Sequence, residues 1–207
     1  MEDLFKNRQE AGELLADEIK KKLADIQNGL ILALPRGGVI VGAKIAKNLG
    51  WPLDIIVTRK IGSPGNPEYA IGAVSANTEV FGREFVSKQY LDEAIRKERQ
   101  EIQRRILKYR GHKPALELKG KNVFLVDDGL ATGLTMIAAI KEIRAQKPNK
   151  IIVVVPVAPP ETVEEIKKMA DEIIVLKIEP LFFAIGQFYI DFSQVSDLEV
   201  KELLKDY

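Results

Sequence analysis

Two adjacent carboxylates, Asp127 and Asp128, follow a run of four apolar residues at positions 123–126. A short continuous apolar run fits a strand that is buried on both faces of a parallel sheet. The pair would then stand at the carboxyl end of that strand, where ligands of open α/β sheets bind. Carboxylate oxygens accept hydrogen bonds, and the vicinal hydroxyls of a ribose can donate them. Asp127 and Asp128 are therefore well placed to accept hydrogen bonds from such hydroxyls, although two adjacent aspartates at a strand end are also common without a ligand.

The turn after the acidic pair has the composition of a phosphate-binding loop. Gly129 and Gly133 allow the backbone to wrap closely around an anion, and the hydroxyls of Thr132 and Thr135 can donate hydrogen bonds to it. The N–H groups and the dipole of the helix that follows would also bind a phosphate monoester. The alternative is a strand, a turn and an Asp-capped helix without a ligand, but the complete run is harder to explain as structure alone. Its spacing matches neither a nucleotide-binding P-loop nor a Gly-x-Gly-x-x-Gly fingerprint.

Apolar runs alternate with helical periodicity along the rest of the chain. Strands are expected at 30–34, 53–57, 123–126, 151–155 and 173–176, and helices at 7–26, 39–49, 88–110, 132–145 and 161–170. Asn7 is the expected cap of the first helix, with Glu10 in the capping-box position. Strands that alternate with helices indicate an α/β fold with a doubly wound, mainly parallel five-stranded sheet.

The segment before the long charged helix has a different character. Residues 63–67 (Ser-Pro-Gly-Asn-Pro) are dense in turn formers, which predicts that regular structure breaks there. Residues 71–75 and 79–81 are expected to pair as a small ribbon around 76–78.

The composition limits the class of protein. With 207 residues, of which 46% are apolar and 29% charged, the chain fits a single globular domain, 1–207. A net charge of +1 argues against nucleic acid and anionic membranes as partners, and the lack of cysteine excludes disulfides and thiolate chemistry. The start of the chain is not a signal peptide, and no apolar run approaches the ~20 residues of a membrane span. We therefore expect a cytoplasmic protein.

With these motifs the sequence resembles the type I phosphoribosyltransferases, whose signature is an apolar strand, two acidic residues and a Thr-Gly-x-Thr turn. It is most similar to their predicted phosphoribosyltransferase branch. That branch combines Asp-Asp-Gly-Leu-Ala-Thr-Gly, here 127–133, with Leu-Pro-Arg-Gly-Gly-Val and Gly-Gln-Phe-Tyr, here 34–39 and 186–189. Gly129 departs from the wider family, which usually has an apolar residue there. The resemblance implies the fold of this family, with a small hood formed by about 1–28 and 177–207.

The resemblance also implies a substrate, 5-phosphoribosyl-1-pyrophosphate (PRPP), and its contacts. Asp127 and Asp128 would be catalytic residues on the ribose hydroxyls. The 5-phosphate would bind to the loop of Gly129, Leu130, Ala131, Thr132, Gly133, Leu134 and Thr135. The pyrophosphate would contact Pro35, Arg36, Gly37 and Gly38, and two further catalytic cations would be Arg59 and Lys60. The simpler alternatives are a tight turn with an exposed arginine and a solvated strand end.

The implied reaction transfers the ribose phosphate to a nitrogen acceptor, a nucleobase or another compound that the sequence does not identify, and releases pyrophosphate. Mg²⁺ would be held mainly by substrate oxygens and water, which this ion prefers as ligands. Residues 61–70 are the candidate lid that keeps water from the sugar cation, and their alternative is an irregular surface connection. A different class of function is a non-catalytic PRPP-binding regulatory protein with an RNA-binding face. The resemblance is compatible with a homodimer and does not decide the oligomeric state.

The remaining conspicuous residues have simpler interpretations. His112 lies in a predicted surface turn, and Trp51 is expected to pack at the edge of the second strand. A solvated, salt-bridged helix face is expected for Arg96, Arg99, Arg104, Arg105 and Arg110. Three interpretations stay open for one aromatic cluster: stacking on a heterocyclic acceptor, a hydrophobic seal or a dimer contact. Its members are Phe182, Phe183, Phe188, Tyr189 and Phe192.

Overall fold

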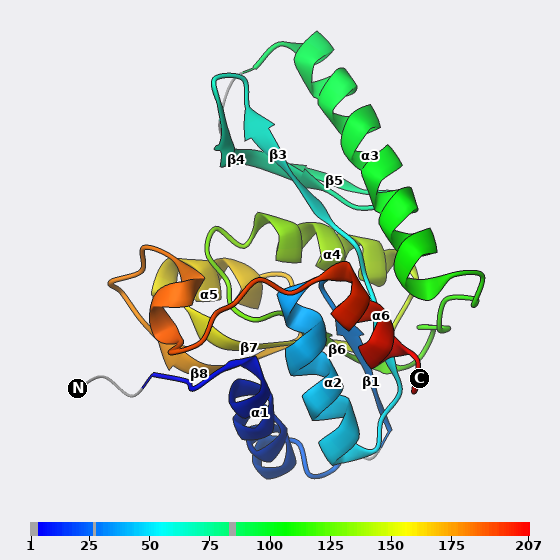
Figure 1. Cartoon of the computed structure of the whole chain (residues 1–207), viewed down its shortest axis with the longest axis vertical. Coiled ribbons are helices and arrows are strands. Elements are labelled where there is room, and N and C mark those ends of the chain that lie inside the picture. Colours follow the sequence, from blue (N-terminus) through cyan, green and yellow to red (C-terminus); the bar gives the residue numbers. More distant parts are fainter. Residues whose placement is uncertain (1–3, 27, 83–85) are drawn as a thin grey trace.

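The computed structural model describes residues 4–26, 28–82 and 86–207, and its centre is a five-stranded parallel sheet (Figure 1). The spatial order is β2-β1-β6-β7-β8. The bounds are β1 Gly29–Ala33, β2 Leu53–Ile55, β6 Asn122–Val126, β7 Lys150–Ala158 and β8 Glu172–Ile178. The five predicted strands and their parallel pairing are therefore confirmed, and their ends differ from the prediction by no more than three residues.

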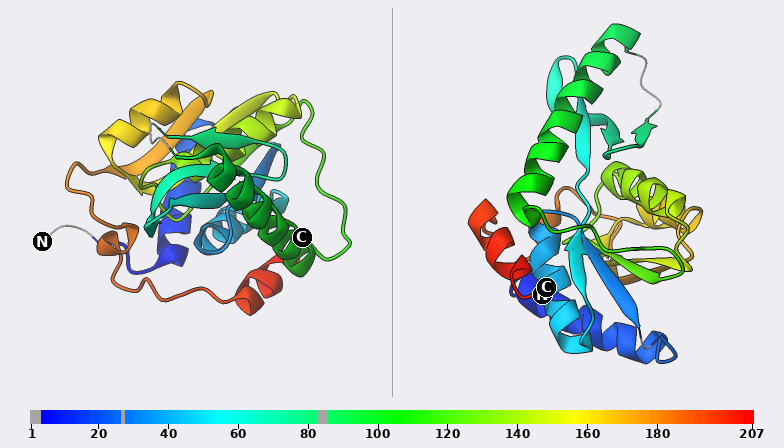
Figure 2. Two further views of the ribbon diagram at one scale, coloured as in Figure 1. Left: turned by 90° about the horizontal axis from the view of Figure 1, so that it is seen from above. Right: turned by 90° about the vertical axis from the view of Figure 1, so that its right-hand side faces the viewer.

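Helices cover both faces of this sheet (Figures 1 and 2). The first layer consists of α1 (Arg8–Lys22) and α2 (Gly37–Leu49), and the second of α4 (Leu134–Ala145) and α5 (Pro160–Lys167). Successive side chains of a strand point to opposite faces. Phe124 accordingly packs into the core beneath the first layer, and Leu125 into the core beneath the second. This is the expected doubly wound arrangement.

Two helix starts differ from the prediction at residues of the candidate site. Because α2 begins at Gly37, two residues earlier than expected, Gly37 and Gly38 form its first turn and not a loop. Because Gly133 has a left-handed backbone with φ of +72°, α4 begins only at Leu134. The loop that precedes α4 is therefore longer than the sequence predicts.

An antiparallel sheet and a long helix project from the central sheet, and we call them the arm (Figure 2). The arm contains β3 (Arg59–Ser63), β4 (Asn66–Val74), β5 (Glu79–Phe81) and α3 (Lys88–Arg110). The predicted ribbon is confirmed, since Gly72 of β4 lies opposite Phe81 of β5. The bounds of the long helix are those predicted, and Ser87 caps its start.

The break in regular structure that is predicted at residues 63–67 is confined to a turn of two residues, and the candidate lid, residues 61–70, is otherwise strand. β3 and β4 form a hairpin in which Pro64 and Gly65 are the turn. Gly62 makes close pairing feasible, because a Cβ atom there would lie 2.4 Å from the carbonyl oxygen of Pro67. The hydroxyl of Tyr90 on α3 donates to the carbonyl oxygen of Gly62 over 2.7 Å. Tertiary contacts thus order residues that look like turn formers in isolation, and a role of the hairpin as a lid stays a prediction.

Residues 5–6, near the start of the described chain, pair with residues 188–191. The N–H of Phe5 donates to the carbonyl oxygen of Phe188 over 2.9 Å, and the N–H of Ile190 donates to that of Phe5 over 2.8 Å. The last elements are the 3-10 helix η1 (Ile185–Phe188) and α6 (Asp197–Leu204), which contacts both α2 and α3. The segments predicted to form a hood are thus adjacent, and α6 joins them to the arm.

Candidate functional site

The acidic pair lies at the carboxyl end of β6, as predicted, and directly beneath the first turn of α2. A Cβ atom on Gly37 would lie 1.9 Å from Oδ2 of Asp128, and one on Gly38 would lie 2.9 Å from Cα of Asp127. Only glycine therefore allows the backbone of α2 to approach the pair this closely. The structure brings the candidate pyrophosphate loop and the candidate ribose-binding carboxylates into contact.

Asp128 is buried, with 8% of its surface exposed, and is held by residues from both chain ends. Nε of Arg8 donates to its Oδ2 over 2.6 Å, and the hydroxyl of Tyr189 donates to its carbonyl oxygen over 2.7 Å. Sequence reasoning missed Arg8, because its partner is 120 positions away and nothing local distinguishes it from other basic residues at a helix start. Arg8 also donates to the carbonyl oxygen of Ser193 over 2.9 Å and lies 3.8 Å from the centre of the Phe192 ring.

Asp127 is the more accessible carboxylate of the two, being half-buried. Its Oδ1 accepts a hydrogen bond from the N–H of Asp128 over 2.8 Å. Burial raises the pKa of Asp127 well above its usual value, and the negative charge of Asp128 adds to this increase. The pair is therefore a site where a donor, such as a sugar hydroxyl, or a cation would be stabilised.

The loop after Asp127 and Asp128 leads into a helix start whose backbone N–H donors have no partner within the helix. The first backbone hydrogen bond within α4 runs from Ile137 to Gly133, so the N–H groups of residues 134–136 have no partner inside the helix. No side chain caps the helix, and Thr132 is exposed. Thr162 of α5 fixes the loop from behind, because its hydroxyl donates to the carbonyl oxygen of Ala131 over 2.6 Å. Such a helix start can bind an anion.

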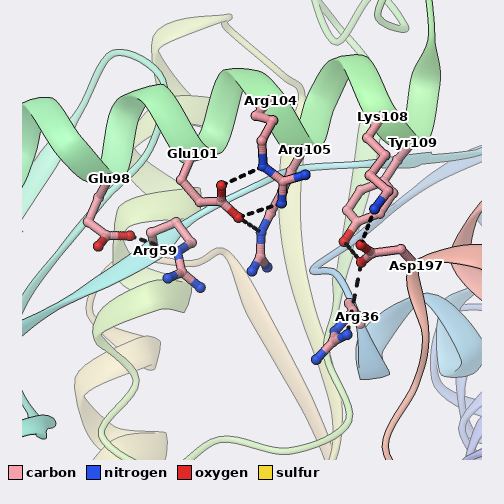
Figure 3. Close-up of polar contacts among 9 residues, drawn as sticks. All are labelled: Arg36, Arg59, Glu98, Glu101, Arg104, Arg105, Lys108, Tyr109 and Asp197. Carbon is pink, nitrogen blue, oxygen red and sulfur yellow. Dashed lines mark hydrogen bonds and ion pairs between the residues drawn. The ribbon is translucent and has the colours of Figure 1, made fainter.

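Two of the predicted cations, Arg36 and Arg59, lie on the same side of α3 and near opposite ends of its segment from Glu98 to Tyr109 (Figure 3). Arg36 precedes α2, and its Nη1 lies 3.9 Å from Oδ1 of Asp197 at the start of α6. Arg59 begins β3, and its Nε donates to Oε2 of Glu98 on α3 over 2.8 Å. Lys60 follows on β3, where strand alternation directs it to the opposite face of the ribbon. The structure thus brings Arg36 and Arg59 to α3.

The aromatic cluster is divided by the structure. Phe188 and Tyr189 are buried, and the ring of Phe182 packs against Phe188 with centroids 5.1 Å apart. Phe183, in contrast, is 89% exposed. The hydrophobic seal therefore describes most of the cluster, and Phe183 is the member that is open to a ligand or a second chain.

One arginine of the long helix was wrongly assigned to a solvated face. Arg110 donates through Nε to Oδ1 of Asp54 over 3.0 Å, and Asp54 is only 7% exposed. A buried carboxylate requires a cation, which explains why Arg110 turns inward. His112 is exposed, as predicted, and Trp51 packs on Phe124 with ring centroids 4.7 Å apart.

Across 4–26, 28–82 and 86–207, no group of three or more histidine, aspartate or glutamate side chains has the arrangement of a metal site. In the same ranges, no helix has both the length and the apolar character that crossing a bilayer requires.

Fold and site together define a class: an α/β protein with an acidic pair and an anion-binding helix start at the carboxyl edge of a parallel sheet. The sequence model of the phosphoribosyl transferase domain matches residues 2–193, and the chain belongs to this family. The resemblance on which the prediction rested is therefore confirmed, and the fold is that of the type I phosphoribosyltransferases.

Two curated relatives from Mycobacterium tuberculosis (strains CDC 1551 / Oshkosh and ATCC 25618 / H37Rv) bear the name "Putative phosphoribosyl transferase". Each is 39% identical over 209 residues, which cover 97% of this chain and 46% of the relative. The chain thus spans about half the length of these relatives.

Two solved structures illustrate the range of the fold. The protein TT1426 from Thermus thermophilus has a TM-score of 0.83 and 38% identity, with 98% of both chains covered. A purine phosphoribosyltransferase from Pyrococcus horikoshii Ot3 has a TM-score of 0.51 and 17% identity, with 91% of this chain and 92% of that chain covered. The second likeness concerns the fold alone.

Proposed function

We propose that this chain is a phosphoribosyltransferase that uses PRPP with Mg²⁺ and releases pyrophosphate. The observation that carries the proposal is the arrangement of three structural parts at the carboxyl edge of the central sheet. The start of α2, the acidic pair and the uncapped start of α4 meet at the carboxyl end of the central sheet. PRPP has three matching parts, namely a pyrophosphate, a ribose with two hydroxyls and a 5-phosphate.

Each part of the edge has a role in this proposal. The N–H groups at the start of α4 and the hydroxyls of Thr132 and Thr135 bind the 5-phosphate. Asp127 accepts hydrogen bonds from the ribose hydroxyls, and Asp128, held by Arg8, contributes its remaining oxygen. Residues 35–38 bind the pyrophosphate through backbone N–H groups and Arg36.

The proposed chemistry breaks the bond between ribose C1 and a pyrophosphate oxygen. The electron pair of that bond leaves with the pyrophosphate, and positive charge develops on the sugar, as in glycoside cleavage. The acceptor nitrogen then forms the new bond to C1. Arg36 and Arg59 stabilise the negative charge of the leaving group. A covalent enzyme intermediate is not required.

The side chains at this edge fit a magnesium ion that is held mainly by its substrate. Asp127 and Asp128 are a pair and not a three-ligand cluster, and Mg²⁺ readily combines one or two carboxylates with phosphate oxygens and water. Bound there, Mg²⁺ would act as a Lewis acid on the pyrophosphate. The protein's own residues bind, orient and screen the sugar.

A titration of Mg²⁺ and PRPP, followed by calorimetry, tests the proposal with wild type and the double variant Asp127→Asn/Asp128→Asn. We expect saturable binding by wild type that the double variant loses. Asp17→Asn is the control, because Asp17 is 63% exposed on α1 and should bind normally. Folded wild type that does not bind PRPP would contradict the proposal.

Catalysis is tested separately, by pyrophosphate release in the presence of a panel of nucleobases and amines. We expect release with at least one nitrogen acceptor. Binding of PRPP without release for any acceptor would favour the non-catalytic alternative, a PRPP-binding regulatory protein.

A further inference from the structure

One face of α3 carries a stripe of polar side chains. Glu98, Glu101, Arg105 and Tyr109 follow one another at intervals of three and four residues, which places them on the same side of the helix. At a rise of 1.5 Å per residue, the stripe is about 16 Å long. Figure 3 shows that it faces the start of α2 and the start of β3.

The two arginines assigned to the pyrophosphate approach opposite ends of this stripe. Arg59 is bound at one end, where its Nε donates to Oε2 of Glu98 over 2.8 Å. Arg36 approaches the other end through Asp197, whose Oδ1 accepts a hydrogen bond from the hydroxyl of Tyr109 over 2.6 Å. Arg36 itself stays 3.9 Å from that oxygen. The middle of the stripe thus lies between the two cations.

Arg105 occupies this middle position and keeps an uncompensated charge. Its Nε donates to Oε1 of Glu101 over 2.7 Å. The same carboxylate already accepts two hydrogen bonds from Arg104, over 2.7 and 2.8 Å. The hydrogen bonds from Arg104 and then Arg105 lower the pKa of Glu101 to about 2, so it carries one negative charge at neutral pH. The single negative charge of Glu101 is shared by the guanidinium groups of Arg104 and Arg105, so one positive charge stays uncompensated.

The side chain of Arg105 is more buried than that of its neighbour Arg104. The side chain of Arg105 is 19% exposed and that of Arg104 is 55% exposed. Figure 3 shows the tip of Arg105 pointing from α3 toward the region between Arg59 and Arg36. Within the described part of the chain, the terminal nitrogens of Arg59 and Arg105 donate to no protein acceptor. Their donors are free for a ligand.

Arg105 and Arg36 also flank the same group, because Arg105 precedes Tyr109 by one turn on α3, and Arg36 lies 3.9 Å from the carboxylate oxygen of Asp197 that Tyr109 binds. Burial and the hydrogen bond to Asp197 raise the pKa of Tyr109 to about 12, and the charges of Arg105 and Arg36 oppose this increase. Both guanidinium groups therefore lie close enough to Tyr109 to act on it electrostatically.

We propose that Arg105 of α3 binds the pyrophosphate group of the substrate, between Arg36 and Arg59, as a third cation of that subsite. This inference rests on the proposed function and adds the arm to the binding site. Three guanidinium groups, each with unused donors, suit an anion with several oxygens, since guanidinium groups can bind phosphates through two parallel hydrogen bonds. When the bond to C1 breaks, the electron pair passes to the pyrophosphate, and Arg105 stabilises the charge that this group gains.

The test compares Arg105→Gln with its matched control, Arg104→Gln, by calorimetric titration of three ligands. Two of them, Mg²⁺-pyrophosphate and PRPP with Mg²⁺, contain the pyrophosphate group, and the third, ribose 5-phosphate, does not. Loss of a charge-assisted hydrogen bond should weaken binding of the first two to Arg105→Gln about tenfold. Binding of ribose 5-phosphate should stay unchanged. Arg104→Gln should bind all three as wild type does, although both variants lose a partner of Glu101.

The outcomes separate this inference from the proposed function. If wild type binds PRPP and Arg105→Gln binds it equally well, the role of Arg105 is wrong and the proposed function survives. An equal loss in Arg104→Gln would also overturn the inference, because it would show a general effect of charge on α3. If folded wild type binds neither PRPP nor pyrophosphate, both proposals fail. Arg105→Lys, which keeps the charge, should recover part of the affinity if charge and position both matter.

Discussion

Nε of Arg8 donates to Oδ2 of Asp128 over 2.6 Å, and the two side chains are only 9% and 11% exposed. This ion pair joins the first residue of α1 to the end of the central strand β6. Because Arg8 also contacts Phe192 and Ser193, the start of α1, residues 192–193 and the acidic pair are joined. Residues of both predicted hood segments therefore hold the acidic pair in place.

Removal of this arginine should destabilise the fold and the site together. Arg8→Met leaves the buried carboxylate of Asp128 without its cation, which typically costs about 3–5 kcal/mol. We expect the free energy of unfolding, measured with urea, to fall by that order and PRPP binding to be lost.

The double variant Arg8→Met/Asp128→Asn provides the control, because it removes both charges of the pair. Since replacing a whole buried ion pair is far less harmful than breaking it, the double variant should recover most of the stability lost in Arg8→Met. Strictly additive losses in the two single variants and the double variant would show that the pair is not coupled.

The stability of the ligand-free protein should depend on the titration of Asp127. Burial, and then the charge of Asp128, raise the pKa of Asp127 well above its usual value, so the folded chain binds this proton more tightly than the unfolded chain. Its contribution to stability is therefore fully present below the unfolded pKa and is lost as pH rises through the folded pKa. In Asp127→Asn the side chain cannot ionise, so this loss disappears.

Urea unfolding of wild type and Asp127→Asn from about pH 4 to about pH 8 measures the difference. We expect the stability of the variant relative to wild type to increase with pH over this range. Parallel curves for the two proteins would mean that Asp127 titrates normally. Asp17→Asn, at an exposed position of α1, should give a curve parallel to that of wild type.

The central sheet and the acidic loop could be predicted because their signals are local. Residues 151–155 are a continuous apolar run, and such a run specifies a buried strand without reference to the rest of the chain. The acidic pair, the glycines and the threonines at 127–135 likewise stand next to one another in sequence, so their combination is visible at once.

The parts that could not be predicted depend on distant partners. Nothing near Arg8 indicates Asp128, and nothing near Arg110 indicates the buried carboxylate of Asp54. The β3–β4 hairpin was missed for a related reason, since Tyr90 on α3 anchors it at Gly62. The turn propensity of residues 63–67 is realised only at Pro64 and Gly65, and antiparallel pairing orders the residues on either side.

Gly37 should tolerate no side chain, and Gly65 offers a matched comparison. A Cβ atom on Gly37 would lie 1.9 Å from Oδ2 of Asp128, whereas one on Gly65 would meet nothing within 4 Å. Gly37→Ala should lower the free energy of unfolding by about 1–3 kcal/mol through overpacking and abolish PRPP binding. Gly65→Ala should have little effect on either measurement. Wild-type affinity in Gly37→Ala would show that α2 does not need to contact the acidic pair for ligand binding.

Thr162 should hold the loop that binds the 5-phosphate without contacting the phosphate itself. Its hydroxyl donates to the carbonyl oxygen of Ala131 over 2.6 Å, and its methyl group lies 2.8 Å from where a Cβ atom on Gly133 would be. Thr162→Val keeps this packing but removes the donor, which should cost about 1 kcal/mol and loosen the loop. Affinity for ribose 5-phosphate should therefore fall about fivefold, while affinity for Mg²⁺-pyrophosphate stays as in wild type.

Thr162→Ser, which retains the hydroxyl, is the control for the hydrogen bond. If that bond is responsible, Thr162→Ser should bind ribose 5-phosphate more tightly than Thr162→Val. An equal fall in affinity for both ligands in Thr162→Val would instead indicate a general loss of structure.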